Sequence, residues 1–359
     1  MEPIRVGIIG FGMMGRMQAV GCFGALADEF RLAAICDDHP PHLAAARDLY
    51  GPEVRYFSDY RRMLDECDFD LAAVVTPDYF HEEMATACLR AGRHLRLEKP
   101  MALDPGGCAR VIEAARRAGT VVQIGLELRY AELVGRMRER REVLGRLKML
   151  WCHEFRHPFL AKLGSVPDWI VRKEYSGGTL IEKCCHHFDL FNDFAGARPA
   201  SVYASGDHEV QYAYTDVLDN AFATVEYENG VRANLSLCMF APPAEGRPGL
   251  STLDFGLLGD SGRMEMRSDE LSVWDRHRPG VESYRHERVD LVGHDDEIVP
   301  SLRDLARCVR EGGRPVADLR AGLSSVMTSW AAEESVRLRR PVTMREVEER
   351  FEVEYPAQG

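Results

Sequence analysis

The sequence lacks three features that would set it apart from an ordinary globular protein. It has no excess of positive charge, and its formal net charge is -12 at pH 7. This argues against nucleic acid or an anionic membrane surface as the main partner, because both bind a basic face. No apolar run is long enough to span a bilayer, and the first residues, Met1 to Arg5, lack the regions of a signal peptide. We therefore expect a cytoplasmic protein with neither a nucleic-acid nor a membrane partner.

Cysteine and histidine occur without the spacing that a metal site requires. The cysteines lie singly inside apolar segments, apart from the pair Cys184 and Cys185, and none forms a C-x-x-C motif. Free buried thiols in a reducing compartment are therefore expected rather than disulfides. In the run Cys184-Cys185-His186-His187, consecutive helical side chains would point about 100 degrees apart and could not converge on one ion. The sequence predicts no metal site.

The length of 359 residues exceeds what one hydrophobic core usually organises, so two domains are expected. Residues 1–126 alternate short apolar runs with helix-like segments. The expected strands are Ile4–Ile9, Arg31–Cys36, Leu71–Thr76, His94–Glu98 and Val121–Gly125. The expected helices include Pro41–Tyr50, Glu82–Ala91 and Pro105–Ala118, the last with Asp104 as N-cap. Regular alternation of this kind predicts an α/β domain with a parallel sheet covered on both faces.

A different pattern follows in residues 127–345. After a helix-like stretch over Tyr130–Val143, longer alternating strands are expected at Arg146–Arg156, Ser201–Ser205, Asn220–Tyr227 and Val231–Cys238. The turn Glu228-Asn229-Gly230 favours a hairpin, and hence an antiparallel or mixed sheet with one covered face. Helices over Leu302–Glu311 and Ala321–Arg339 close this α+β domain, and residues 346–359 are expected to form a loose polar tail.

The strongest motif is the glycine turn Gly10-Phe11-Gly12-Met13-Met14-Gly15, which follows an apolar strand and opens a helix. In this context Gly10 permits a tight turn and Gly12 lets the backbone approach a pyrophosphate. Gly15 allows the helix to pack closely on the sheet, and backbone N–H groups face the phosphates. The motif predicts dinucleotide binding by a Rossmann-type domain.

The second expected strand ends in Asp37, about 20 residues beyond the glycine turn. An acid at this place accepts hydrogen bonds from the adenosine ribose hydroxyls, and its charge repels the 2′-phosphate of NADP. Asp38 adds to this repulsion. NAD is therefore favoured as the cofactor over NADP, although Arg47 or His42 could still approach a phosphate.

Several separated segments together resemble the Gfo/Idh/MocA family of oxidoreductases, which includes glucose-fructose oxidoreductase and inositol dehydrogenases. The segments are the glycine turn, Thr76-Pro77-Asp78-Tyr79-Phe80-His81, Glu98-Lys99-Pro100, Ser176-Gly177-Gly178 with His186 and Asp189, Ala331-Ala332-Glu333-Glu334-Ser335, and Arg340-Pro341-Val342. The resemblance covers nearly the whole chain. Their order and spacing carry it, because no single segment is decisive.

The resemblance implies a Rossmann domain followed by a domain with a large, open, mostly antiparallel sheet. The outer face of that sheet would form a homodimer or homotetramer. It also implies oxidation or reduction of a carbinol carbon in a sugar or cyclitol, with hydride exchanged at nicotinamide C4. Lys99 would transfer the proton, and Thr76, Pro77, His81 and Glu98 would line the nicotinamide half of the cofactor.

The residues support the same chemistry. Lys99 follows an expected parallel strand at its carboxyl end, where α/β proteins bind ligands, and can exchange a proton with the reacting hydroxyl. A helix expected over Thr179–Ala195 would place Glu182, His186 and Asp189 on one stripe facing a cleft. His186 could share proton transfer and Glu182 could orient a hydroxyl, while the alternative role of Asp189 is to anchor the helix.

Some positions depart from the commonest family pattern. Glu182 and Cys184 replace an aspartate and a glycine, Glu127 stands where a polar amide is frequent, and Asp78 replaces a frequent asparagine. The longer Glu182 side chain changes which hydroxyl would be oriented. Candidate substrate contacts precede the second glycine pair: Arg156, Trp169, Arg172 and Tyr175. An arginine can bind hydroxyls or an acidic group, and a tryptophan can stack on a sugar face.

Three functions are compatible with these residues. The first is an NAD-dependent dehydrogenase or reductase acting on a sugar, glycoside or cyclitol. The second is a redox-neutral glycosidase that oxidises C3 transiently, eliminates the glycosidic substituent and returns the hydride. The third is a sensor of dinucleotide or sugar without turnover. Retention of Lys99, Glu182 and His186 argues against the sensor.

Overall fold

The computed structural model describes residues 2–156, 167–210, 215–242, 251–267, 269–285 and 295–357. The chain forms two compact units. The first comprises Met1–Tyr130 and Val289–Gly322, and the second comprises Ala131–Arg288 and Leu323–Gly359. The first division between the units, after Tyr130, lies close to the domain boundary predicted from the sequence, between residues 126 and 127. The segment that ends at Gly322 had been expected in the second domain instead.

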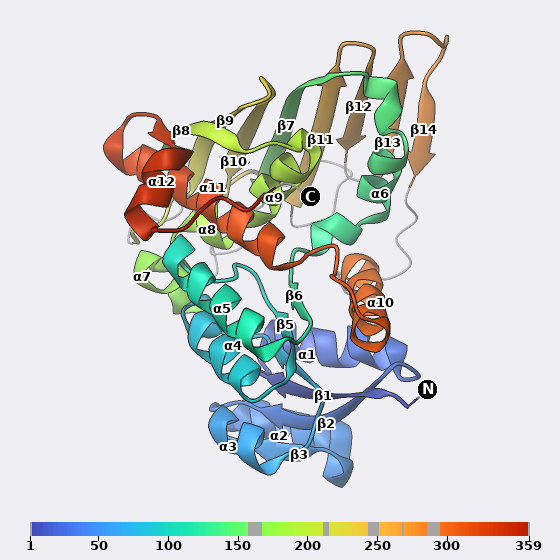
Figure 1. The fold of residues 1–359 in the computed structure, drawn as a ribbon, viewed down its shortest axis with the longest axis vertical. Helices are drawn as coiled ribbons and strands as arrows, with labels where there is room; N and C mark the ends of the chain where they lie inside the picture. The colour runs from blue at the N-terminus through green and yellow to red at the C-terminus, as the bar shows by residue number, and fades with distance from the viewer. Residues whose placement is uncertain are drawn as a thin grey trace. The chain divides into compact units, whose positions relative to one another are not determined.

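The first unit contains a six-stranded parallel sheet in the order β3-β2-β1-β4-β5-β6 (Figure 1). Its strands are β1 Ile4–Ile9, β2 Phe30–Cys36, β3 Arg55–Phe57, β4 Leu71–Val74, β5 His94–Leu97 and β6 Val122–Ile124. The strand order reverses between β1 and β4, and open α/β sheets bind ligands at the carboxyl ends of strands beside such a reversal. The predicted Rossmann-type sheet is confirmed.

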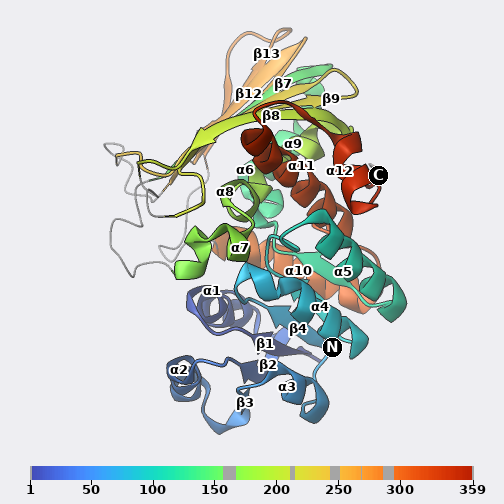
Figure 2. The same ribbon diagram turned by 90° about the vertical axis from the view of Figure 1, so that its left-hand side faces the viewer.

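Helices lie on both sides of this sheet (Figure 2). They include α1 Met13–Met17, π-helical η1 Gln18–Phe23, α2 Pro40–Tyr50, α3 Tyr60–Glu66, α4 His81–Arg90, α5 Pro105–Ala118 and α10 Asp295–Glu311. The Asp104 carboxylate accepts a hydrogen bond from the Gly107 backbone N–H at 2.8 Å, so the predicted N-cap of α5 is confirmed.

Helix α10 belongs to the first unit because its apolar side chains complete that unit's core. Ile298, Leu302 and Leu305 are buried in one cluster with Phe23 and Phe30. This packing depends on residues nearly 300 positions apart, which explains why sequence reasoning assigned the helix to the neighbouring domain.

The second unit contains a nine-stranded sheet in the order β14-β13-β12-β11-β7-β10-β9-β8-β15. Its strands are β7 Leu147–Arg156, β8 Pro199–Asp207, β9 Asn220–Tyr227, β10 Arg232–Cys238, β11 Ser251–Gly259, β12 Gly262–Arg267, β13 Glu270–Asp275, β14 Glu282–Arg285 and β15 Val342–Thr343. Only β7 and β10 pair in parallel, and the other neighbours pair antiparallel. The predicted mostly antiparallel sheet is confirmed, including the β9–β10 hairpin.

One face of this sheet is covered by helices. The helical elements of the unit are α6 Glu132–Glu139, η6 Arg141–Leu144, η7 Asp168–Val171, α7 Lys173–Ser176, α8 Thr179–Glu182, α9 Cys185–Ala195, α11 Leu319–Leu338 and α12 Met344–Phe351. On α9, the rings of Phe191 and Phe194 lie 5.9 and 5.7 Å from that of Phe255 on β11. Inward residues of β9, such as Ala223 and Val225, are buried, as the alternating sequence predicts.

Two helix predictions for this unit were wrong. The helix expected over Thr179–Ala195 is broken into α8 and α9, because the Lys183 and Cys184 backbone N–H groups both turn back to the Thr179 carbonyl. Residues 346–351 of the expected loose tail belong to α12, where Thr343 and Glu346 form a capping box.

The cysteine prediction agrees with the structure, since all ten are free thiols and nine of them are buried. Across the described ranges, no group of three or more His, Cys, Asp or Glu side chains is arranged to hold a metal ion. Within those same ranges, no helix combines the length and apolarity needed to cross a membrane.

Candidate functional site

The glycine turn has the geometry that a dinucleotide requires. Gly10 has φ of +94°, and a Cβ there would lie 2.4 Å from the Val75 carbonyl oxygen. A Cβ on Gly15 would lie 2.0 Å from the Gly10 carbonyl oxygen, so the helix sits directly against the turn. A Cβ on Gly12 would meet only a His42 atom, at 3.8 Å. The turn is therefore tight at its two ends and open at its centre, where backbone can approach a phosphate.

Asp37 is bonded to this turn. Its carboxylate accepts hydrogen bonds from the Phe11 backbone N–H at 2.6 Å and the His39 N–H at 2.8 Å. The His42 Nδ1 atom lies 3.1 Å from the same carboxylate. Asp37 thus shapes the glycine turn in addition to presenting negative charge at the end of β2, and the predicted contact with ribose stays a prediction.

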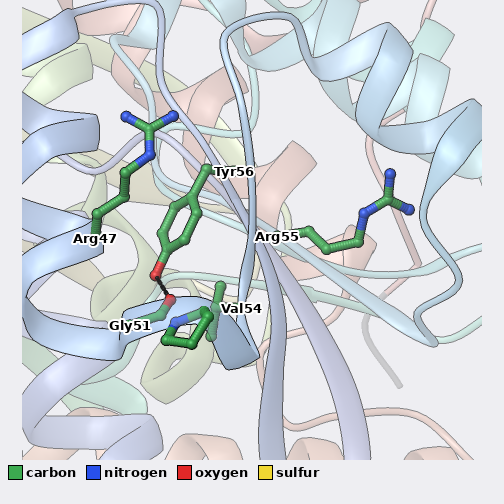
Figure 3. A pocket seen from close by; sticks show the side chains of 6 residues that line it. Arg47, Gly51, Val54, Arg55 and Tyr56 are labelled. Atoms are coloured by element: carbon green, nitrogen blue, oxygen red, sulfur yellow. Dashed lines mark hydrogen bonds between the residues drawn. The ribbon is translucent and has the colours of Figure 1, made fainter.

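A shallow cavity of about 460 Å³ lies elsewhere on the first unit, lined by Arg47, Gly51, Pro52, Val54, Arg55 and Tyr56 (Figure 3). The Tyr56 hydroxyl donates to the Gly51 carbonyl at 2.7 Å, and the Arg47 guanidinium lies over the Tyr56 ring. Arg47, the alternative phosphate contact considered from the sequence, therefore packs on its neighbour. None of the predicted cofactor residues lines this cavity.

His81 connects the segment after β4 to the segment after β5. Its Nδ1 lies 2.7 Å from the Pro100 carbonyl oxygen and its Nε2 lies 3.0 Å from that of Thr76. Complete burial lowers the pKa of His81 despite these two carbonyl acceptors. A neutral ring carries one N–H group, so it donates to only one of the two carbonyls and packs against the other. The contacts hold Thr76-Pro77 and Lys99-Pro100 at the carboxyl ends of adjacent strands.

A buried polar network positions Glu98 and the Lys99 backbone. The Gln18 amide donates to Glu98 Oε1 at 2.6 Å, and the Lys99 N–H donates to Glu98 Oε2 at 3.3 Å. Arg96 is almost wholly buried and donates to the amide oxygens of Gln18 and Gln123. Sequence reasoning identified Glu98 but missed Gln18 and Arg96. The available signal was a polar side chain inside an apolar helix, for Gln18, and inside an apolar strand, for Arg96.

Glu127 extends this cluster at the end of β6. Burial, reinforced by the Glu98 carboxylate, raises the pKa of Glu127 to about 8, while Lys99 and Arg96 act in the opposite direction. The carboxyl group is therefore mainly protonated at pH 7. At this position, where the family resemblance pointed to an amide, the chain holds a neutral acid.

In the second unit, Glu333 of α11 fixes the Gly177–Gly178 turn. Its carboxylate accepts hydrogen bonds from the Leu180 N–H at 2.9 Å and the Lys173 ammonium at 2.8 Å. Gly178 has φ of +105°, and a Cβ there would lie 2.4 Å from Glu333 Oε1. Glu333 lay in a segment that carried the resemblance, but no role for it was predicted.

The break between α8 and α9 separates the predicted polar stripe. Glu182 ends α8, whereas His186 and Asp189 lie one turn apart on α9 and are both buried. The neighbouring His187 reaches Glu154 of β7, with its Nε2 3.3 Å from Glu154 Oε2.

The candidate substrate residues fall into two places in the second unit. Trp169 lies in η7, Arg172 follows it, and Tyr175 lies in α7 and is 39% exposed. All three precede the Gly177–Gly178 turn in the chain, and their contact with substrate stays a prediction. Arg156 stands apart from them at the end of β7, with its Nε 3.5 Å from Glu154 Oε1.

The parallel sheet, its strand reversal and the glycine turn define a dinucleotide-binding domain joined to a separate mixed-sheet domain. Residues 4–126 match the family model described as an oxidoreductase family NAD-binding Rossmann fold. Residues 140–344 match the model of the C-terminal alpha/beta domain of the same oxidoreductase family. The chain belongs to the Gfo/Idh/MocA oxidoreductase family, and its first unit is an NAD-binding domain.

Individual relatives agree with this assignment. A myo-inositol 2-dehydrogenase of Thermotoga maritima is 24% identical over 355 residues, covering 96% of this chain and 99% of the relative. A D-glucoside 3-dehydrogenase of Escherichia coli is 28% identical over 248 residues, covering 64% and 68%. The WlbA dehydrogenase of Bordetella pertussis, solved with NADH and UDP-GlcNAcA, has a TM-score of 0.81 at 23% identity, covering 95% of this chain and 99% of that one.

Proposed function

We propose that this chain is an NAD-dependent dehydrogenase or reductase acting on a carbinol carbon of a sugar, glycoside or cyclitol. Its curated relatives include an inositol dehydrogenase and a glucoside dehydrogenase, and both act on ring hydroxyls. The observation that carries the proposal is the contact of His81 with the segments that follow β4 and β5. Together with Glu98 and Glu127, it surrounds the segment that bears Lys99.

Lys99 is the proposed proton-transfer residue. Oxidation of a carbinol releases a hydroxyl proton, and bound NAD supplies the hydride acceptor for the same step. Lys99 is partly buried, and its backbone is fixed through Glu98 to Gln18 and through Pro100 to His81. A side chain that starts from a fixed backbone loses less entropy when its ammonium is held beside a reacting oxygen.

His186 and Glu182 are the catalytic residues that we propose in the second unit. His186 is proposed to share the proton transfer with Lys99, and Glu182 to orient a neighbouring hydroxyl. Trp169, Arg172 and Tyr175 are proposed to contact the sugar. Glu182 lies outside α9, so its side chain is set by the Lys183–Cys184 turn and not by a continuous helix.

The preference for NAD over NADP is proposed to rest on Asp37. Its buried carboxylate follows β2, where a 2′-phosphate would meet its negative charge. Replacing Asp37 by Asn removes the charge and keeps one acceptor oxygen, so only one of the Phe11 and His39 N–H groups retains its hydrogen bond. The ratio of NAD to NADP affinity should then fall by at least tenfold.

The test is Lys99→Met assayed against a panel of sugars, glycosides and cyclitols. We expect kcat to fall about 10²- to 10⁴-fold with NAD affinity unchanged within a factor of two. Arg117→Met, an exposed change on α5, is the control. Full activity in Lys99→Met would refute the assignment. Product identity is followed with NADH absorbance, because glycoside cleavage without NADH would establish the redox-neutral reaction instead.

We also propose that the uncovered face of the second sheet joins copies of this chain as a homodimer or homotetramer. Its outward positions carry large exposed apolar side chains, namely Met149, Phe155, Tyr203 and Phe222. Phe222 is 67% exposed, which is unusual for an isolated sheet face. Sedimentation should show an oligomer that Phe222→Lys weakens, and a monomeric wild-type chain would exclude this proposal.

A further inference from the structure

A histidine side chain joins the acid that follows β2 to the glycine turn. The Nδ1 atom of His42, in the first turn of α2, lies 3.1 Å from Asp37 Oδ2, and the Phe11 N–H donates to the same oxygen at 2.6 Å. A Cβ built on Gly12 would lie 3.8 Å from His42 Cε1. His42 therefore borders both the carboxylate and the open part of the turn, where backbone can approach a phosphate.

The contact with Asp37 determines which nitrogen of the neutral His42 ring carries the proton. A carboxylate only accepts hydrogen bonds, so Nδ1 donates to Asp37 and Nε2 is left as an acceptor. A phosphate oxygen is also an acceptor, and the neutral ring therefore offers it no donor through Nε2. When the ring takes up a proton, Nε2 becomes a donor and the ring gains one positive charge.

Protonation of His42 also changes the charge that a cofactor meets beside the turn. With a neutral ring, the Asp37 carboxylate presents one negative charge, which opposes the 2′-phosphate of NADP. With a protonated ring, the pair carries no net charge. The His42 side chain is 42% exposed and that of Asp37 is 8% exposed, so the cation is the more accessible member of the pair. One proton therefore decides whether these two residues oppose a 2′-phosphate or accept it.

A second histidine lies against the first. The centroids of the His39 and His42 rings are 4.4 Å apart, and the His39 backbone N–H donates to Asp37 Oδ1 at 2.8 Å. Histidine is the side chain whose ordinary titration falls between pH 5 and 8, so the two rings must be tested separately. The charged side chains on the end of β2, on α1 and on α2 near this pair are Asp38, Arg16 and Arg47.

We propose that His42 is a further cofactor-binding residue, whose charge sets the choice between NAD and NADP. Neutral His42 leaves Asp37 to exclude the 2′-phosphate, whereas protonated His42 offsets Asp37 and binds that phosphate. The chain therefore selects NAD at pH 8 and accepts NADP at pH 5.5. This inference rests on the proposed role of Asp37 in cofactor preference and names the residue that modifies it.

The experiment measures the dissociation constants of NAD and NADP by calorimetry at pH 8 and at pH 5.5, for the wild-type chain and two variants. His42→Asn keeps a neutral N–H donor for Asp37 and cannot gain charge, whereas His42→Lys is charged at both pH values. Between pH 8 and pH 5.5, the ratio of NAD to NADP affinity should fall about tenfold further in the wild-type chain than in His42→Asn. His42→Lys should show the low ratio at both pH values.

Two further histidine variants are the controls. His39→Asn removes the neighbouring ring and should retain most of the wild-type pH dependence. His277→Asn removes an exposed histidine from the turn after β13 in the second unit and should retain all of it. The 2′-phosphate of NADP itself takes up a proton at about pH 6, so proteins are always compared at the same pH. Thermal unfolding at both pH values establishes that each variant is folded.

A wild-type affinity ratio that changes with pH no more than that of His42→Asn would overturn this inference. Loss of the pH dependence in His39→Asn but not in His42→Asn would also overturn it. Equal gains for NAD and NADP at pH 5.5 would show that the ring meets only their shared pyrophosphate, which contradicts a role in cofactor choice. These results leave the proposed function in place. Equal affinity for NAD and NADP at pH 8, unaltered by Asp37→Asn, would instead overturn the proposed preference for NAD.

Discussion

Each unit buries a glutamate near its candidate functional residues, and the two glutamates have opposite surroundings. Glu127 in the first unit lies beside a second carboxylate, Glu98, and its pKa is raised to about 8. Glu154 in the second unit lies among Lys183, His187 and Arg156, and its pKa is lowered. One acid is mainly neutral at pH 7 and the other is ionised.

The difference shows that neighbours, and not burial, decide the state of these acids. Burial alone raises the pKa of both carboxyl groups. In the first unit the neighbour is Glu98 at an adjacent strand end, and its carboxylate has the same negative charge that Glu127 would carry. In the second unit the neighbours are positively charged or hydrogen-bond donors, with Lys183 and His187 about 30 residues away along the chain and Arg156 on the same strand as Glu154. The first unit can therefore accept or give up a proton near neutral pH, whereas the second offers fixed charge.

The largest expected effect comes from removing the negative charge of Glu154 in the second unit. Glu154→Gln would leave Lys183 and Arg156 without the carboxylate that they share, and loss of one partner from a buried ion pair costs about 3–5 kcal/mol. Urea unfolding at pH 7 measures this loss. Glu127→Gln is the contrasting change, since the folded chain keeps this acid protonated at pH 7 while the unfolded chain releases the proton, and a glutamine removes that cost and should stabilise the chain. Similar losses in the two variants would contradict the comparison.

One glycine substitution in each unit tests whether the first unit binds NAD and the second binds the sugar. Gly10→Ala and Gly178→Ala each place a Cβ 2.4 Å from an oxygen at positive φ, which costs about 1–3 kcal/mol in local strain. Gly10→Ala should weaken NAD binding about 10- to 100-fold. Gly178→Ala should leave NAD affinity within threefold of the wild-type value. It should instead lower kcat/KM for the sugar about 10- to 100-fold. Calorimetry with NAD and steady-state kinetics measure both, and loss of NAD affinity in Gly178→Ala would refute the division of roles.

The same contrast explains what the sequence could predict. In the first unit, the glycine turn, Asp37 and Glu98-Lys99-Pro100 are local motifs, so the sheet and the candidate residues followed from short segments. In the second unit, the roles of Glu154, Glu333 and Lys183 depend on contacts between distant segments. Strand alternation predicted the mostly antiparallel sheet, but no local pattern indicated which charged side chains would meet inside it.

The break at Lys183–Cys184 illustrates the same limit. Helical periodicity over Thr179–Ala195 is strong enough to predict one helix, and nothing in the local sequence resembles a breaker. The turn instead accompanies the contact of Lys183 with Glu154 and of His187 with the same carboxylate. Tertiary contacts therefore override the local preference at this point.

A smaller effect tests the proton state of Glu127. Its folded-state pKa of about 8 lies above its usual value of 4.5. Between these values the folded chain retains a proton that the unfolded chain has released, so the free energy of unfolding falls as pH rises and levels off above 8. The fall should reach about 1 kcal/mol between pH 6 and 7. Glu127→Gln should abolish it, and identical pH dependence in the two proteins would show that Glu127 is ionised throughout.

The smallest effects compare one helix cap in each unit. Asp104 caps α5 through the Gly107 N–H, and Thr343 caps α12 through the Glu346 N–H at 3.2 Å. Asp104→Ala and Thr343→Ala should each lower the free energy of unfolding by about 1 kcal/mol, because each leaves a helix-end N–H group without its acceptor. Urea unfolding followed by tryptophan fluorescence and by circular dichroism measures both losses, with Thr343→Ser as the control that retains the hydroxyl. An unchanged unfolding midpoint in Thr343→Ala would mean that α12 adds nothing to the second unit, as expected of a loose tail. A loss equal to that of Asp104→Ala would make α12 as integral to its unit as α5 is to the first.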